Sequence, residues 1–380
     1  MRILWYGPHP EMPSGYSQQT GIWARALAGL GHDVAIACWA GQLDYFSAWN
    51  GIPIFPASTR SKWSEDYVHG HYRQWKADLC IRLSCAWPLT PEHWRDMRVA
   101  HWLPVDCSPI SLGDYHVMND GAVPVAMSRF GQRQIAAGRP HEGLGGLPAD
   151  YYVPHGVDMS GTFTPPQDRA ALRAEMGLPE HLFVIGINAR NGDGDPDRKA
   201  WHENLRAFAI YHKRHPDSVL LIHSMMMEPG GLLLASFIKH LGIASAVKFT
   251  EQYPVATGMV PAAEMARWYG GLDVLLATSC GEGFGIPVIE AQGCGTPVIV
   301  SDAHTGPELA GPGWLVKGEL RWNWHHQAEW FRPSVRGIVK ALESAYAHAR
   351  SRRELSREFA MSYDVAAVLP QWKAILDEFT

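Results

Sequence analysis

Two glutamates that enclose a glycine-rich turn are the residues best suited to do chemistry. Glu282 and Glu290 have seven residues between them, and glycines follow Glu282 at alternate positions. Glycines let a ligand approach the backbone closely, and the amides at the start of a helix attract phosphate. A carboxylate accepts two hydrogen bonds at once, so Glu290 is suited to the vicinal hydroxyl groups of a ribose. The segment predicts a phosphate and sugar site that includes the backbone of Gly283, Phe284, Gly285 and Ile286.

Each glutamate taken alone also fits a solvated surface, Glu282 as a turn residue and Glu290 as an exposed helical residue. Their setting favours a binding site, because the turn lies between two regular elements. The apolar run Val274–Ala277 predicts a buried strand, and Pro287 suits the first turn of a helix because its missing N–H would have no partner there.

Short apolar runs alternate with helical stretches along the whole chain, which is typical of parallel sheets covered on both faces. The first series of predicted strands comprises Ile3–Tyr6, Val34–Cys38, Ile52–Phe55, Leu79–Leu83, Val99–Leu103 and Val123–Met127. The second comprises Phe183–Asn188, Val219–His223, Val247–Thr250, Val274–Ala277 and Val298–Val300. We therefore predict an α/β protein with two tandem Rossmann-like doubly wound domains that face each other across a cleft.

The domain boundaries follow from a Pro- and Gly-rich segment that we interpret as a hinge, near Pro154–Pro166. The N-terminal domain is expected at residues 1–158, completed by a helix at 363–380, and the C-terminal domain at 167–362. Ligands of doubly wound sheets bind at the carboxyl ends of the strands. In the first domain this points to Gly15 and Asp106. An ordinary turn glycine, and an aspartate that caps a turn, are the alternatives.

Two further residues at strand ends have structural interpretations. His101 lies inside an apolar run and is predicted to be a core histidine, although it stays a second candidate behind Asp106. Ser128 follows a strand and is predicted to cap the next helix, and Ser128 and Arg129 are further candidates for lining the cleft.

The segment around the two glutamates resembles the E-x7-E motif of retaining glycosyltransferases of family 4, which have the GT-B fold. The segments Tyr152–Asp158 and Phe163–Pro165 resemble the hinge signature of that family, and Thr296–Ile299 and Gly306–Glu308 resemble the segments after the motif. The matches run from Tyr152 to about Lys317 and are looser elsewhere.

The resemblance implies a role for each of these residues. Glu282 would contact the transferred sugar and Glu290 the ribose, while the glycine-rich turn would bind sugar hydroxyls and the distal phosphate. Related enzymes have a His or Asp near the position of Asp106, where it touches the donor sugar or the acceptor. Gly15 would lie beside the diphosphate. The second domain would thus bind the nucleotide-sugar donor, and the first domain would form the acceptor side.

The family also uses an arginine and a lysine after the first strand of the second domain. Arg190, Arg198 and Lys199 are the candidates, because a cationic pair stabilises the charge that accumulates on the leaving diphosphate. An insertion, Gly192–Asp197, separates Arg190 from Lys199 more widely than is usual, and leaves open whether Arg198 or Lys199 contacts the phosphate.

The insertion also contains alternating aspartates, as calcium loops and DxD metal sites do. Its sixth position is Arg198 and its twelfth is Asn204, where a calcium loop needs Gly and Glu. The surrounding motifs belong to a metal-free architecture, so we predict no metal site.

Composition excludes several classes of protein. A net charge of −5 disfavours a dedicated nucleic-acid binder. We find no signal-peptide pattern and no apolar run long enough to span a bilayer. The six cysteines are scattered without CxxC spacing, which indicates reduced core residues. We therefore expect a cytoplasmic protein without stable membrane insertion.

Two clusters have competing interpretations. Four arginines near the C-terminus alternate with glutamates at helical spacing, which predicts a solvated helix face rather than a phosphate-binding patch; they are Arg350, Arg352, Arg353 and Arg357. An aromatic loop could form a platform for an acceptor sugar, but packing is the favoured interpretation; it contains Trp322, Trp324, His325, His326 and Trp330.

We therefore predict a metal-independent, retaining hexosyl- or pentosyltransferase that uses a nucleotide diphosphate sugar and no cofactor. Family frequency favours a UDP-sugar over a GDP-sugar. The acceptor stays open among a saccharide, a lipid-linked sugar, a protein and a modified DNA base. The alternatives are a nucleotide-sugar epimerase or phosphorylase on the same fold, and a non-catalytic nucleotide-sugar-binding module. A dinucleotide dehydrogenase would need G-x-G-x-x-G after the first strand, which the chain lacks.

Overall fold

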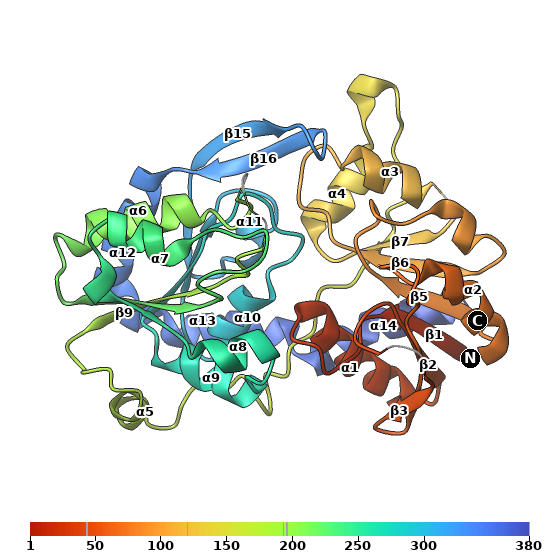
Figure 1. Ribbon diagram of the computed structural model, residues 1–380, viewed down its shortest axis with the longest axis horizontal. Coiled ribbons are helices and arrows are strands. Elements are labelled where there is room, and N and C mark those ends of the chain that lie inside the picture. Colours follow the sequence, from red (N-terminus) through yellow and green to blue (C-terminus); the bar gives the residue numbers. More distant parts are fainter. Residues whose placement is uncertain (43–44, 120, 193, 195–196, 380) are drawn as a thin grey trace. The chain divides into compact units, whose positions relative to one another are not determined.

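The computed structural model describes residues 1–379 apart from 43–44, 120, 193 and 195–196. The chain divides into two compact units. The first unit comprises Met1–Gly156, Trp322–Glu329 and Val365–Thr380, and the second comprises Val157–Arg321 and Trp330–Asp364. Each unit is built on its own largely parallel sheet with helices on both faces (Figure 1). The predicted class, two Rossmann-like α/β domains, is confirmed.

The sheet of the first unit has eight strands in the order β3-β4-β2-β1-β5-β6-β7-β8. Its strands are β1 (Arg2–Gly7), β2 (Asp33–Cys38), β3 (Ser47–Trp49), β4 (Ile52–Phe55), β5 (Leu79–Leu83), β6 (Val99–Leu103), β7 (Val123–Ala126) and β8 (Tyr151–Tyr152). All neighbouring strands are parallel except β3 and β4. The chain leaves β1 in one direction and returns on its other side, which makes the β1/β5 boundary a topological switch point.

The helices of the first unit are α1 (Gly15–Gly29), α2 (Glu65–Trp75), α3 (Leu112–Met118), α4 (Arg129–Ala137) and α14 (Val365–Glu378). Four buried tryptophans tie the first and last helices to the sheet. Trp372 of α14 packs edge-on against Trp5 and Trp102, with ring centroids 6.0 and 5.2 Å apart, and Trp23 of α1 completes the group. Each such ring buries a large apolar area, so this contact brings the C-terminal helix onto the N-terminal sheet.

The sheet of the second unit has six parallel strands in the order β11-β10-β9-β12-β13-β14. They are β9 (Phe183–Asn188), β10 (Ser218–His223), β11 (Val247–Phe249), β12 (Val274–Ala277), β13 (Val298–Ser301) and β14 (Trp314–Val316). Successive strands are added on one side of β9 up to β11 and on its other side from β12 onward. The carboxyl ends of β9 and β12 are therefore the expected position of a ligand.

Helices cover both faces of the second sheet (Figure 1). One face packs against α6 (Trp201–His212), α7 (Leu234–His240) and α12 (Val335–His348), whose apolar side chains join the strands in one buried core. The remaining helices are α5 (Arg169–Glu175), α8 (Gln252–Thr257), α9 (Ala262–Gly271), α10 (Ile286–Gly293), α11 (Gly306–Leu309) and α13 (Arg353–Ala360).

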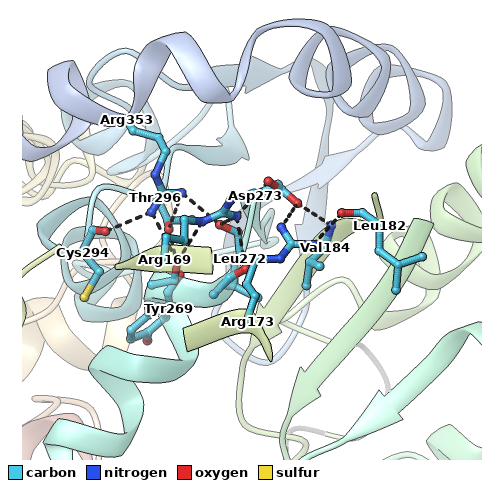
Figure 2. A network of polar contacts seen from close by, with 12 residues as sticks. Arg169, Arg173, Leu182, Val184, Tyr269, Leu272, Asp273, Cys294, Thr296 and Arg353 are labelled. Carbon is cyan, nitrogen blue, oxygen red and sulfur yellow. Dashed lines mark hydrogen bonds and ion pairs between the residues drawn. The ribbon is translucent and has the colours of Figure 1, made fainter. Parts of the chain in front are cut away.

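A buried carboxylate links the beginning of β12 to α5 (Figure 2). Asp273 is only 4% exposed and forms ion pairs with Arg169 at 2.8 Å and with Arg173 at 3.0 Å. It also accepts a hydrogen bond from the backbone N–H of Val184 in β9. This network therefore joins α5 to the beginnings of the central strands β9 and β12.

Of the four arginines near the C-terminus, Arg350 is exposed as predicted, but Arg352, Arg353 and Arg357 are partly buried and bound to backbone carbonyls, so for these three the prediction is wrong. Arg353 donates hydrogen bonds to the carbonyls of Gly270, Leu272 and Cys294, at the C-terminal ends of α9 and α10 (Figure 2). Arg357 donates to the carbonyl of Gly293 at the end of α10. Helix C-termini carry unpaired carbonyls and partial negative charge, and a cation there satisfies both.

Arg353 is desolvated by its contacts with these helix ends. Burial and the nearby Arg169 lower the pKa of Arg353 to about 10. The guanidinium therefore stays charged at neutral pH and continues to bind the carbonyls of both helices.

A two-stranded sheet, which we did not predict, is formed by β15 (Gly318–Asn323) and β16 (Ala328–Pro333). The distal part of this hairpin, Trp322–Glu329, belongs to the first compact unit. Leu320, Trp322 and Trp324 alternate with Glu319, Arg321 and Asn323, so the alternation that usually identifies a strand is present in β15 and was a usable signal.

Two other findings concern the chain as a whole. Five of the six cysteines are buried, and burial raises the pKa of Cys38, Cys80, Cys280 and Cys294 to about 12. Among the described residues, no helix combines the length and apolar character that a bilayer span requires.

Candidate functional site

A pocket in the second unit lies at the carboxyl ends of β9, β12 and β13. It comprises about 570 Å³ of empty space, part of which is open solvent. Its walls come from the strand ends, the glycine-rich turn and the start of α11. The lining residues include Asn188, Ala189, Lys199, Asn204, Thr278, Ser279, Glu282, Phe284, Gly285, Ser301, Thr305 and Gly306.

The glycine-rich turn adopts a backbone conformation that requires glycine. Gly285 has φ +111° and ends the turn at the N-terminus of α10. The hydroxyl of Thr305 donates a hydrogen bond to the carbonyl of Phe284 at 2.7 Å, which anchors the turn to the loop before α11. The N-terminus of α10 therefore opens on the pocket with its positive partial charge, as a phosphate site requires.

Lys199 and Glu282 are brought together in this pocket. The Nζ of Lys199 lies 2.5 Å from Oε2 of Glu282, and Nη1 of Arg198 lies 3.7 Å from Oε1. Burial alone would raise the pKa of Glu282, but the charges of Lys199 and Arg198 lower it below its ordinary value. Glu282 is therefore an ionised carboxylate at neutral pH, with two cations beside it.

Arg198 has a second contact that fixes its direction. Its Nη1 donates a hydrogen bond to the carbonyl of Gly281 at 3.0 Å. The Lys199 ammonium donates instead to the carboxylate of Glu282, and its side chain is 17% exposed. Of the two cations, Lys199 lines the pocket directly.

The segment before α6 positions Lys199. Asp197, the last residue of the insertion, accepts hydrogen bonds from the backbone N–H groups of Lys199 and Trp201. The side chain of Asn204 donates to the carbonyls of Lys199 and Thr278, which joins this segment to the end of β12. Burial raises the pKa of Asp197 to about 6. Asp193 and Asp195 lie outside the described residues.

Glu290 is buried rather than exposed. Its Oε2 accepts a hydrogen bond from the hydroxyl of Tyr269 at 2.8 Å, and Nδ2 of Asn188 donates to the same hydroxyl at 2.6 Å. Asn188 lines the pocket, whereas Glu290 is not among the described lining residues. Glu290 thus reaches the pocket wall through Tyr269, and its ribose contact stays a prediction.

Arg190 is not brought to this pocket. Its side chain is 74% exposed and forms an ion pair with Glu228 at 2.7 Å. Its predicted contact with the diphosphate stays a prediction, and it would require Arg190 to leave Glu228.

The first unit carries the other predicted residues. Gly15 is exposed and is the first residue of α1, which Ser14 caps by accepting a hydrogen bond from Ser17. Asp106 is half-buried in the loop after β6. His101 is fully buried, between Arg82 Nη2 at 2.8 Å and the Ser84 carbonyl at 3.1 Å, which confirms a core histidine. Burial and Arg82 lower the pKa of His101 well below its ordinary value, so it is neutral.

Ser128 caps α4 as predicted. Its hydroxyl accepts a hydrogen bond from the N–H of Gly131 at 2.9 Å. Arg129 stacks over the ring of Tyr152, with the guanidinium carbon 3.8 Å from the ring centroid.

Several polar residues of the pocket were not singled out from the sequence. Asn188, Thr278, Ser301 and Thr305 directly end or follow β9, β12 and β13. Their position at carboxyl ends of predicted strands was a usable signal. Tyr269 comes from the last turn of α9, and no motif identifies it.

The geometry suits an anionic ligand that also carries hydroxyl groups. The two cations and the α10 N-terminus stabilise negative charge, whereas Glu282 accepts hydrogen bonds from hydroxyls. Within the described part of the chain, no cluster of three His, Cys, Asp or Glu side chains has the arrangement of a metal site.

Most residues that line this pocket lie in a segment that matches a known family. Residues 192–323 match the family Glycosyl transferases group 1. The D-inositol 3-phosphate glycosyltransferase of Paenarthrobacter aurescens is 31% identical over 219 residues, which cover 54% of this chain and 45% of the relative. The enzyme of that name from Pseudarthrobacter chlorophenolicus is 29% identical over 316 residues, 78% of this chain and 66% of the relative. The chain thus spans about half to two thirds of the length of these relatives.

Solved structures show the same fold over the whole chain. Sucrose-phosphate synthase from Thermosynechococcus elongatus superimposes with a TM-score of 0.75 at 15% identity and covers 100% of this chain and 98% of its own. WaaG, a glycosyltransferase involved in lipopolysaccharide biosynthesis, has a TM-score of 0.71 at 13% identity, with 99% of each chain covered. The fold is therefore of the GT-B class, and the resemblance to family 4 is confirmed.

Proposed function

We propose that the protein is a retaining glycosyltransferase using a nucleotide diphosphate sugar, on the premise that residues 192–323 match the family Glycosyl transferases group 1. The observation that supports this proposal is the pairing of Lys199 and Arg198 with Glu282 beside the N-terminus of α10. Such a pocket offers cations and amides to a diphosphate and a carboxylate to the hydroxyls of a sugar.

The proposed reaction breaks the bond between the anomeric carbon and the distal phosphate oxygen. The acceptor oxygen forms its bond to that carbon on the same face, and its proton passes to the departing phosphate. Lys199 and Arg198 stabilise the charge that develops on the phosphate. Glu282 orients the sugar by accepting hydrogen bonds, and Glu290 binds the ribose. Catalysis then rests on positioning and charge stabilisation rather than on an acid–base side chain.

The more specific parts of this proposal come from the sequence analysis. We propose a UDP-sugar ahead of a GDP-sugar, transfer of a hexose or pentose, no metal requirement and a cytoplasmic location. The first unit supplies the acceptor side through Asp106 and Gly15. The relatives are named for D-inositol 3-phosphate, so a phosphorylated polyol belongs in any acceptor panel beside saccharides, lipid-linked sugars and proteins.

The test measures donor binding and turnover separately. The full chain is incubated in chelator with UDP-, GDP-, ADP- and dTDP-sugars and an acceptor panel, and released nucleotide diphosphate is quantified. We expect release with one donor, and stabilisation against heat by the matching diphosphate alone. Glu282→Gln should abolish release and keep the stabilisation.

Two results would contradict the proposal. If no nucleotide diphosphate raised the melting temperature, the pocket would not be a donor site. If the donor sugar changed configuration without release of diphosphate, the epimerase alternative would be favoured instead.

A further inference from the structure

An exposed aromatic cluster lies at the end of the β15–β16 hairpin. Trp324 is 85% exposed and Trp322 is 44% exposed, and their rings meet edge to face with centroids 6.3 Å apart. Trp87 is 47% exposed and lies 6.2 Å from the ring of His325. We call these four residues the tip cluster. Trp330 of the same hairpin is buried and belongs to the packing that the sequence predicted.

The backbone that carries the tip cluster is tied down at several points. Ser108 and Glu329 exchange two backbone hydrogen bonds, at 3.2 and 2.8 Å. The buried guanidinium of Arg139 donates to the carbonyls of Gln327 and Ile110. The rings are thus presented on an ordered backbone, and a ligand would not have to pay for ordering a loop.

Within the hairpin, Asn323 supports the turn that places Trp324. The Oδ1 of Asn323 accepts hydrogen bonds from the N–H groups of His325 and His326, at 2.9 and 3.0 Å. The Asn323 side chain is buried, whereas the ring of Trp324 is exposed to solvent.

The tip cluster lies where the first unit is expected to bind a ligand. Trp87 follows β5, and Ser108 is in the loop that follows β6, two residues after Asp106. The carboxyl ends of β5 and β6 are adjacent in the sheet. Ligands of doubly wound sheets bind at this edge, and Asp106 is the residue for which the sequence predicts an acceptor contact.

The chemistry of the cluster fits a sugar ring. The face of an indole is electronegative, and the C–H groups on one face of a pyranose carry partial positive charge. Histidine ring nitrogens and the Asp106 carboxylate can bond to hydroxyls at the edge of the same sugar. Residues 318–333 contain two glutamates and two arginines, so the hairpin lacks the basic excess that favours an anionic membrane surface.

We propose that the tip cluster binds a sugar ring of the acceptor, so that the acceptor is a saccharide or glycoside. This inference rests on the proposed function, because it assigns the acceptor of the same reaction. Trp324 supplies the stacking face, and Trp322 and Trp87 extend the platform on which a second ring of an oligosaccharide can lie.

The experiment compares Trp324→Ala with Tyr253→Ala on an immobilised glycan array of glucosides, galactosides, mannosides and N-acetylglucosamine oligomers. Tyr253 is 71% exposed in the second unit, which makes it a matched exposed aromatic outside the cluster. The labelled full chain is applied with saturating UDP. We expect the unmodified protein and Tyr253→Ala to retain one glycan class, and Trp324→Ala to bind it about tenfold more weakly.

Two controls keep the outcome interpretable. Stabilisation by UDP should be the same in all three proteins. If none of UDP, GDP, ADP and dTDP stabilised the unmodified protein, the result would contradict the proposed function rather than the tip cluster. Equal glycan retention by Trp324→Ala, or no retained glycan at all, would overturn the inference. So would Trp324-dependent sedimentation with phosphatidylglycerol vesicles, which would assign the cluster to a membrane.

Discussion

Lys199 provides the sharpest test of the pocket, because the structure separates it from Arg190. We consider Lys199→Met, which keeps the apolar stem and removes the charge. Lys199 is 17% exposed and contacts Glu282 in the pocket, whereas Arg190 is 74% exposed and pairs with Glu228 outside it. A charge-assisted hydrogen bond to a phosphate contributes about 1.5–3 kcal/mol. Losing it should weaken binding of a nucleoside diphosphate about 10- to 150-fold.

The comparison with Arg190→Met gives the prediction its control. A surface ion pair contributes roughly 0.2–1 kcal/mol, so this variant should change diphosphate affinity by no more than about fivefold. Isothermal titration with UDP and GDP in chelator measures both variants directly. If Arg190→Met lost as much affinity as Lys199→Met, Arg190 would contact the ligand after leaving Glu228. If Lys199→Met bound normally, our account of the pocket would be refuted.

The same variant has a signature in the pH dependence of turnover. Burial raises the pKa of Glu282, and the charge of Lys199 is the largest of the effects that lower it. Removing that charge in Lys199→Met should therefore raise the pKa of Glu282. The carboxylate is the form that accepts hydrogen bonds from the sugar. The acidic limb of the pH–rate profile should therefore move to higher pH, and an unchanged limb would argue that Glu282 does not act as a carboxylate.

Three further predictions concern other parts of the chain. Glu290→Ala should weaken nucleotide binding, as measured by titration, while the single-turnover rate at saturating donor stays close to that of the unmodified protein, because a ribose contact serves substrate and transition state alike; unchanged nucleotide affinity would exclude that contact. Asp273→Asn should lower the free energy of unfolding by about 3–5 kcal/mol in urea denaturation, because two arginines lose their buried carboxylate. The control Glu175→Gln, which removes an exposed partner of Arg267, should stay within about 1 kcal/mol. Asp106→Asn should reduce transfer without changing diphosphate affinity, and normal transfer would place the acceptor elsewhere.

Local pattern was enough to predict the two Rossmann-like domains and the shape of the glycine-rich turn. Parallel strands covered on both faces are short apolar runs, and each run is visible without knowing its neighbours. The turn is equally local, because Gly285 has a positive φ and Pro287 lies in the first turn of α10. The pairing of Glu282 and Glu290 with this turn therefore followed from adjacent residues.

The tertiary structure alone decided which cation faces the pocket and what the C-terminal arginines do. Lys199 meets Glu282 across 83 positions of sequence, and Arg353 meets Cys294 across 59. An arginine beside glutamates at helical spacing has the same local pattern whether it is solvated or bound to the end of another helix. Likewise, nothing in the sequence separates the exposed ring of Trp324 from the buried ring of Trp330. Burial and long-range pairing are properties of how elements pack, and a pattern read along the chain does not contain them.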